Sequence, residues 1–162
     1  MSTSMRLYLA PEADLRAFSV APRTLQIWLR QPHPQPELSL QESWQDLDAI
    51  IAAEPVAQSK SLLTPKGGDW TYPTAADRGA HGLSLATTRQ LLHAIEQIAR
   101  PQIEAHVRQG RAAEERPAPE LTPEEVSAAT EELLLQLTRL GEWCTRAVTK
   151  HYGLLMALWE ES

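Results

Sequence analysis

The longest regular pattern of apolar positions lies late in the chain, at residues 122–152. It opens with a threonine that can cap a helix, a proline suited to the first turn, and a glutamate that can reach back to the cap amide. Apolar side chains then recur every three or four residues, which places them along one stripe of a helix. The pattern predicts one long C-terminal helix, covered along Val126, Ala129, Leu133, Leu137, Leu140, Cys144, Val148 and Tyr152.

Shorter apolar patterns predict the strands of a sheet. Gly153 ends the helical pattern, and residues 154–159 after it are all apolar. A run of this length is too short for an amphipathic helix and indicates a buried strand. Residues 5–9 alternate, with Met5, Leu7 and Leu9 on one face, which predicts a strand near the N-terminus. Residues 82–86 are expected to add a short strand in the middle of the chain.

Prolines and short polar motifs predict the remaining helices. Helices are expected at 11–18 and 22–30, because a proline suits the first position of each. A capping box at 39–42 should open one more helix, and another at 87–90 should open a helix that Pro101 kinks or restarts. The fold class that follows is α+β. Its sheet is small and built of short strands from the N-terminal, middle and C-terminal parts, packed by roughly four to six helices.

Two segments lack the period of a helix or a strand. Residues 55–81 are interrupted by proline and glycine and predict an irregular loop, and a loop of that length is usually functional or mobile. Residues 111–120 predict a charged, proline-bearing connector. Because the chain has 162 residues and shows no internal repeat, we expect a single α+β domain over residues 1–162.

The net charge of −6 is informative because its excess of acid is local. Residues 114–132 hold seven glutamates and one arginine, which leaves the rest of the chain near neutral. This sign argues against a nucleic-acid partner, and the lack of an apolar run of about 20 residues argues against a membrane span. Cys144 stands alone, so no intramolecular disulfide is possible. With no signal peptide in the sequence, we expect a cytoplasmic protein.

Three stretches carry a resemblance to a known family. They are Ser43-Trp44 with Leu47 and Ile50-Ile51, the strand-to-helix passage at 82–92, and Tyr152-Gly153 before residues 154–159. In this order they resemble the YfbM-like bacterial family of unknown function. The resemblance covers about half of the chain and contains no chemical motif. It implies a small α+β fold and supplies no activity.

The irregular loop carries the first group of candidate functional residues. A carboxylate, a histidine and an arginine in a glycine-hinged loop can bind or turn over a small ligand, although exposed loops collect such residues without any function. This hypothesis predicts a small-ligand-binding protein or a hydrolase-like enzyme. Its residues are Asp69, Trp70, Tyr72, Asp77, Arg78 and His81.

Metal and cofactor sites are not predicted. None of the five histidines has the i, i+4 spacing around a glutamate that zinc enzymes use, and a lone cysteine cannot build a structural zinc site. Cys144 falls on the covered stripe of the long helix, so we expect an inert side chain rather than a nucleophile. No catalytic residue is assigned.

The acidic segment carries the second group of candidates, Glu114, Glu115, Glu120 and Glu124. The plain interpretation is a solvated connector and helix start. The functional interpretation, which we prefer, is a face that docks a basic protein, because complementary charge speeds encounter and fixes orientation. This predicts a non-enzymatic protein-binding domain, such as an immunity protein that neutralises a bacterial toxin. That last step is an analogy, and the sequence leaves the oligomeric state open.

Overall fold

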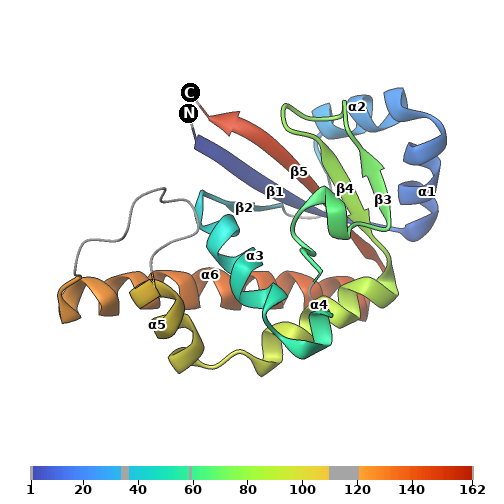
Figure 1. The fold of residues 1–162 in the computed structure, drawn as a ribbon. Coiled ribbons are helices and arrows are strands. Elements are labelled where there is room, and N and C mark those ends of the chain that lie inside the picture. The colour runs from blue at the N-terminus through green and yellow to red at the C-terminus, as the bar shows by residue number, and fades with distance from the viewer. Residues whose placement is uncertain (1, 34–36, 59, 110–120, 162) are drawn as a thin grey trace.

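The computed structural model describes residues 2–33, 37–58, 60–109 and 121–161. An antiparallel sheet lies at its centre, with helices against both faces (Figure 1). The sheet has the strand order β2-β1-β5-β4-β3. Its strands are β1 (Ser2–Ala10), β2 (Leu38–Leu40), β3 (Trp70–Tyr72), β4 (Ala80–Leu83) and β5 (Gly153–Glu161).

The two central strands join the ends of the chain. β1 and β5 pair from the first residue of one to the last residue of the other, so both termini lie at the same end of the sheet (Figure 1). The N-terminal and C-terminal strands predicted from the sequence are confirmed, and at nine residues each they are longer than the short strands expected. This ladder fixes which side chains of β1 and β5 reach each face.

Six α-helices are described, and they divide between the two faces of the sheet. The larger core contains Met5 and Leu7 of β1 and Met156 of β5, whereas Tyr8 and Leu155, which alternate with them, belong to the smaller core. The larger core is covered by α3 (Ser43–Ala52), α4 (Leu85–Gln97), α5 (Arg100–Gln109) and α6 (Pro123–Thr149), and the smaller by α1 (Glu12–Val20) and α2 (Pro22–Arg30). The predicted α+β class is confirmed.

The long helix α6 follows its sequence pattern closely. Thr122 and Glu125 form the expected capping box, and Leu133, Leu137 and Leu140 are buried. The helix is continuous through Gly141, where an added Cβ would lie 3.4 Å from Cγ2 of Ile95 in α4. Burial raises the pKa of the Cys144 thiol to about 12, which makes a thiolate inaccessible at neutral pH.

The capping box predicted at 39–42 is wrong, because its first two residues belong to the edge strand β2. Leu38 and Leu40 are buried, while Ser39 between them is exposed and lies opposite Arg6 of β1. Ser39 is therefore part of a β ladder and cannot cap a helix. Helix α3 begins at Ser43 without a side-chain cap.

The capping box predicted at 87–90 is also wrong. The side chain of Ser84 caps α4 by accepting a hydrogen bond of 3.2 Å from the backbone N–H of Thr87. The middle strand correspondingly lies at Ala80–Leu83, earlier than the predicted 82–86. At Pro101 the helix restarts, since α5 begins anew at Arg100.

The segment expected to be irregular, residues 55–81, contains regular structure. It has two short 310 helices, Pro55–Ala57 and Pro65–Gly67, followed by β3 and the start of β4. The expected connector at 111–120 lies outside the described residues. Within the described part of the chain, none of the helices combines the length and the apolar character that a membrane crossing needs.

Candidate functional site

The hairpin of β3 and β4 separates the loop residues that the sequence analysis grouped together. Trp70 and Tyr72 lie in β3 and pack against the smaller core, where the Tyr72 hydroxyl donates a hydrogen bond of 2.6 Å to the carbonyl oxygen of Leu15. His81 lies in β4 opposite Met156 and is fully buried. It therefore sits on the other face of the sheet from Tyr72.

His81 is a neutral core residue. Its Nε2 lies 3.1 Å from the carbonyl oxygen of Leu62, which can only accept, so Nε2 carries the proton. Removal from water lowers the pKa of His81 to about 4, and the hydrogen bond to Leu62 opposes this only in part. Nδ1 is buried with no hydrogen-bond partner in the described structure. His81 is thus unable to reach a ligand at the surface.

Asp69, Asp77 and Arg78 are exposed and hold the ends of the hairpin. The Asp69 carboxylate accepts a hydrogen bond of 2.7 Å from the backbone N–H of Ser84, just before α4. The Asp77 carboxylate accepts one of 3.0 Å from the backbone N–H of Glu160, and the Arg78 Nε lies 2.5 Å from the Glu160 carboxylate. The structure therefore brings Asp77 and Arg78 together at the end of β5, and leaves Asp69 at the far end of the hairpin.

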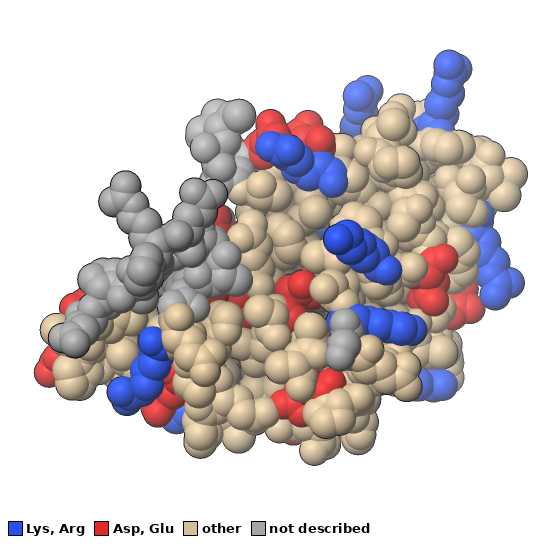
Figure 2. Space-filling view, in the orientation of Figure 1, with Lys and Arg blue, Asp and Glu red and all other residues tan. Residues whose placement is uncertain are grey.

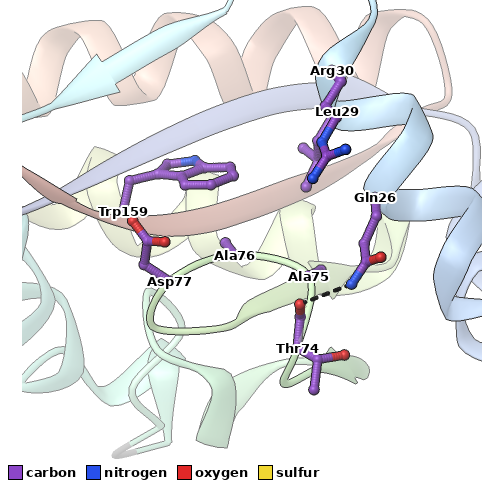
Figure 3. Close-up of a pocket in the computed structure, with 8 residues that line it drawn as sticks. All are labelled: Gln26, Leu29, Arg30, Thr74, Ala75, Ala76, Asp77 and Trp159. Carbon is purple, nitrogen blue, oxygen red and sulfur yellow. Dashed lines mark hydrogen bonds between the residues drawn. The ribbon is translucent and has the colours of Figure 1, made fainter.

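A pocket of about 280 Å³ lies beside Asp77. It is enclosed by helix α2, by the turn 73–79 that joins β3 to β4, and by the end of β5 (Figure 3). Its lining combines a few polar groups with apolar ones. The lining residues are Gln26, Leu29, Arg30, Thr74, Ala75, Ala76, Asp77 and Trp159.

Backbone hydrogen bonds hold the turn against β5. The Arg78 N–H donates to the carbonyl oxygen of Leu158, and the Leu158 N–H donates to that of Gly79, each at 3.0 Å. Gly79 has φ of 91°, a left-handed conformation that glycine adopts without strain. On the opposite side, the Gln26 side chain donates a hydrogen bond of 3.1 Å to the carbonyl oxygen of Thr74 (Figure 3). Both walls are thus fixed before any ligand binds.

Trp159 provides the aromatic surface of the pocket. It follows Leu155 and Ala157 on the same face of β5 and is partly buried. The Arg6 guanidinium lies 5.6 Å from the centre of its ring. The indole Nε1 is buried and has no hydrogen-bond partner within the described chain.

Opposite charges enter the pocket from different walls. Arg30, in the last turn of α2, is exposed, and none of the ion pairs or hydrogen bonds found among the described residues involves its guanidinium. Asp77 comes from the turn, and one of its two carboxylate oxygens is taken by Glu160. In Figure 3, Arg30 lies on the α2 side of the Trp159 ring and Asp77 on the side of the turn.

Sequence reasoning identified Asp77 and missed the other polar residues of this pocket. Arg30 lies in the last turn of α2, where a basic residue is favourable to the helix dipole. Its position therefore did not indicate a binding role. Trp159 did offer a signal, since a large aromatic side chain follows the aliphatic residues 154–158 in β5. Gln26 offered none, because its partner Thr74 is far away in the sequence.

A second hollow, of about 480 Å³, lies on the other side of the molecule between α4 and α6. Both of its walls are helical surfaces, with Glu96 on one and Glu142 and Arg146 on the other. Gly141 is one of the lining residues, and its lack of a side chain leaves room between the two helices. This hollow gathers fewer kinds of binding group than the pocket at Trp159.

The acidic candidates are only partly described. Glu114, Glu115 and Glu120 lie outside the described residues, whereas Glu124 is exposed in the first turn of α6. Acidic and basic side chains are interspersed on the face that Figure 2 shows. Within the described residues, no group of three or more histidine, cysteine, aspartate or glutamate side chains is placed to hold a metal ion.

The fold is that of an α+β protein whose antiparallel sheet lies between two helical layers, with a pocket of about 280 Å³ beside the end of β5. No family model and no curated protein matches the sequence. The solved structure of YfbM from Escherichia coli, a protein of unknown function, is similar, with a TM-score of 0.64 over 96% of this chain and 98% of that one. The two sequences are 11% identical, so the likeness shows the fold alone. It agrees with the fold that the sequence resemblance implied, and membership of the YfbM-like family stays a prediction.

Proposed function

We propose that this protein binds a small molecule in the pocket between α2 and the turn 73–79. The observation that carries the proposal is the meeting of Arg30, Gln26, Asp77 and Trp159, from three separate elements, around one pocket. Binding sites for small molecules usually combine an apolar lining with a few polar groups that fix orientation. The volume of about 280 Å³ suits a ligand at the small end of the usual range.

The chemistry of the lining favours binding over catalysis. Thr74 is the one hydroxyl-bearing side chain of the lining, and no histidine or cysteine is among the lining residues. A nucleophile needs a base within hydrogen-bond reach, and His81, the base considered in the sequence analysis, is buried on the other face of the sheet. The Asp77 carboxylate already holds the backbone of Glu160. These placements support a binding protein.

A screen of small fragments by ligand-observed NMR tests the proposal. Ala76 lines the pocket and is partly buried, so Ala76→Leu should fill part of the space and abolish the binding of the hits. Ala128→Leu, at an exposed position of α6, is the matched control and should keep all of them. If every hit binds wild type and Ala76→Leu equally well, the pocket is not the site.

A second proposal concerns the acidic start of α6. Glu124, Glu131 and Glu132 are exposed within its first turns, and of these Glu131 pairs with Arg100 of α5. An acidic surface of this kind would suit a basic protein partner, and an immunity protein acting on a toxin is the most specific form of that proposal. The clustering of negative charge in residues 114–132 supports it.

Binding kinetics with a captured partner test the second proposal. Charge reversal at Glu114, Glu115, Glu120 and Glu124 should slow association, and added salt should reduce the difference from wild type, because exposed charges are screened. Glu125 is left unchanged, since its carboxylate belongs to the capping box. Equal association rates for both proteins at low and high salt would contradict the proposal.

A further inference from the structure

We infer that the ligand of the pocket at Trp159 is a small zwitterion, an ω-amino acid whose ammonium and carboxylate groups are separated by a short apolar chain. The inference rests on the proposed small-molecule function and adds the chemical class of the ligand. It follows from the charges and the apolar surface that the lining residues present, taken in turn.

The carboxylate end is matched by Arg30. A guanidinium stays charged at any physiological pH and presents paired N–H donors that fit a carboxylate. No described residue forms an ion pair or a hydrogen bond with the Arg30 guanidinium, so its N–H donors face solvent and the pocket. This side of the pocket therefore favours an anionic group.

The ammonium end is matched by Asp77. Its Oδ2 accepts the hydrogen bond of 3.0 Å from the Glu160 backbone, which fixes the direction of the carboxylate. The neighbouring cation Arg78 is engaged by the Glu160 side chain instead, at 2.5 Å. No cation among the described residues forms an ion pair with Asp77, and a carboxylate oxygen remains to accept from a ligand.

The lining also presents apolar groups beside the two charged side chains. Ala75 and Ala76 present only methyl groups, and in Figure 3 the Trp159 ring lies above Asp77 and to the left of Arg30. A short methylene chain can pack against these groups, and an indole face also attracts an ammonium group. Gln26 supplies a side-chain oxygen as a further acceptor, because its N–H group already binds Thr74.

Ligands with one charge satisfy only half of this arrangement. A simple carboxylate would place its charge in the same small pocket as Asp77, and a simple amine would do the same with Arg30. An α-amino acid carries both charges on one carbon, so it has no apolar chain between them to pack against the Trp159 ring and the alanine methyl groups. An ω-amino acid meets both requirements.

The test is a titration of the 15N-labelled protein followed at the Trp159 indole N–H, with that resonance assigned from Trp159→Phe. The probes are 4-aminobutyrate, 5-aminopentanoate and 6-aminohexanoate, with glycine, butyrate and butylamine as matched comparisons. We expect at least one ω-amino acid to shift the resonance saturably, and to bind about tenfold more tightly than the three comparison compounds.

Two substitutions assign the charges. Arg30→Gln and Asp77→Asn should each weaken the binding of the best ω-amino acid by about tenfold. Arg139→Gln on α6 and Asp14→Asn on α1, both exposed and neither among the lining residues, should leave its binding unchanged. Binding of butyrate or butylamine as tight as that of the ω-amino acids, or unchanged affinity in Asp77→Asn, would overturn the inference.

The titration and the fragment screen together distinguish a failure of this inference from a failure of the proposed small-molecule function. If other fragments bind the pocket and are lost in Ala76→Leu while no ω-amino acid binds, the ligand class is wrong and the small-molecule function stands. If neither the zwitterions nor any fragment binds in a way that Ala76→Leu abolishes, both fail.

Discussion

The side-chain amide of Gln26 donates a hydrogen bond of 3.1 Å to the backbone carbonyl oxygen of Thr74. This contact joins helix α2 to the turn between β3 and β4 across 48 residues of sequence. It therefore links two walls of the pocket (Figure 3). The shape of the pocket therefore depends on a hydrogen bond between its two walls.

Replacement of Gln26 should loosen the pocket more than it destabilises the protein. An exposed neutral hydrogen bond contributes about 0.5 to 1.5 kcal/mol, so Gln26→Ala should lower the free energy of unfolding by no more than that. Amide hydrogen exchange in the turn 73–79 should nevertheless speed up. Gln41→Ala, at an exposed position before α3, is the control and should change neither quantity. Unchanged exchange in the turn of Gln26→Ala would contradict this role.

His81 should make the protein less stable in mild acid. Its pKa is lowered from 6.5 to about 4 by burial, so between these values the unfolded chain binds a proton that the folded protein does not. The contribution of neutral His81 is fully present above pH 6.5 and is lost as the pH falls toward 4, by roughly 3 kcal/mol in total.

Urea unfolding of wild type and His81→Leu across this pH range measures the effect. The difference in unfolding free energy between the two proteins should change with pH. The unfolding free energy of His93→Gln, a control at an exposed position of α4, should depend on pH as that of wild type does. The comparison between variants is needed because burial raises the pKa of Asp48, which stabilises the protein as the pH falls. A difference that is constant with pH would show that His81 titrates alike in both states.

Two glycines should respond in opposite ways to a methyl group. A Cβ at Gly153 would lie 2.2 Å from the backbone oxygen of Leu83, so Gly153→Ala must displace the contact between β4 and β5. We expect a loss above about 2 kcal/mol, because the clash is with backbone in the sheet. At Gly141 the nearest atom is 3.4 Å away, so Gly141→Ala should stabilise α6 by up to about 1 kcal/mol. Thermal unfolding measures both, and equal shifts would contradict the packing described.

Two leucines of α6 form a similar pair. Leu137 is buried in the larger core and Leu135 is half exposed. Leu137→Ala should lower the free energy of unfolding by about 2 to 5 kcal/mol, whereas Leu135→Ala should change it by less than about 0.5 kcal/mol. Chemical denaturation gives both values. A loss below about 1 kcal/mol at Leu137 would mean that another face of α6 is covered.

The parts of the fold that could be predicted are those in which the pattern of apolar residues continues over many positions. Helix α6 shows its apolar stripe over many turns and has a capping box at Thr122, and β5 follows a glycine with an unbroken apolar run. The strand β2 has only three residues, so its alternation is too short to distinguish from the start of a helix. Ser39, which suits a helix cap in isolation, was placed by the pairing with β1.

The candidate site depends on contacts that local patterns do not carry. Asp77 was identified because a charged residue in a loop is a simple signal, but its partner Glu160 is 83 residues away. His81 was misleading for the same reason. A histidine next to glycines resembles an exposed loop residue, and the pairing of β4 with β5 places it in the core. The pocket itself exists only once α2, the turn and β5 have come together.

A crystal structure with the tightest fragment from the screen bound tests the small-molecule function most directly. We expect density for the fragment between α2 and the turn 73–79, against the ring of Trp159 and within hydrogen-bond distance of Arg30 or Asp77. Density in the hollow between α4 and α6, with the pocket at Trp159 empty, would contradict it.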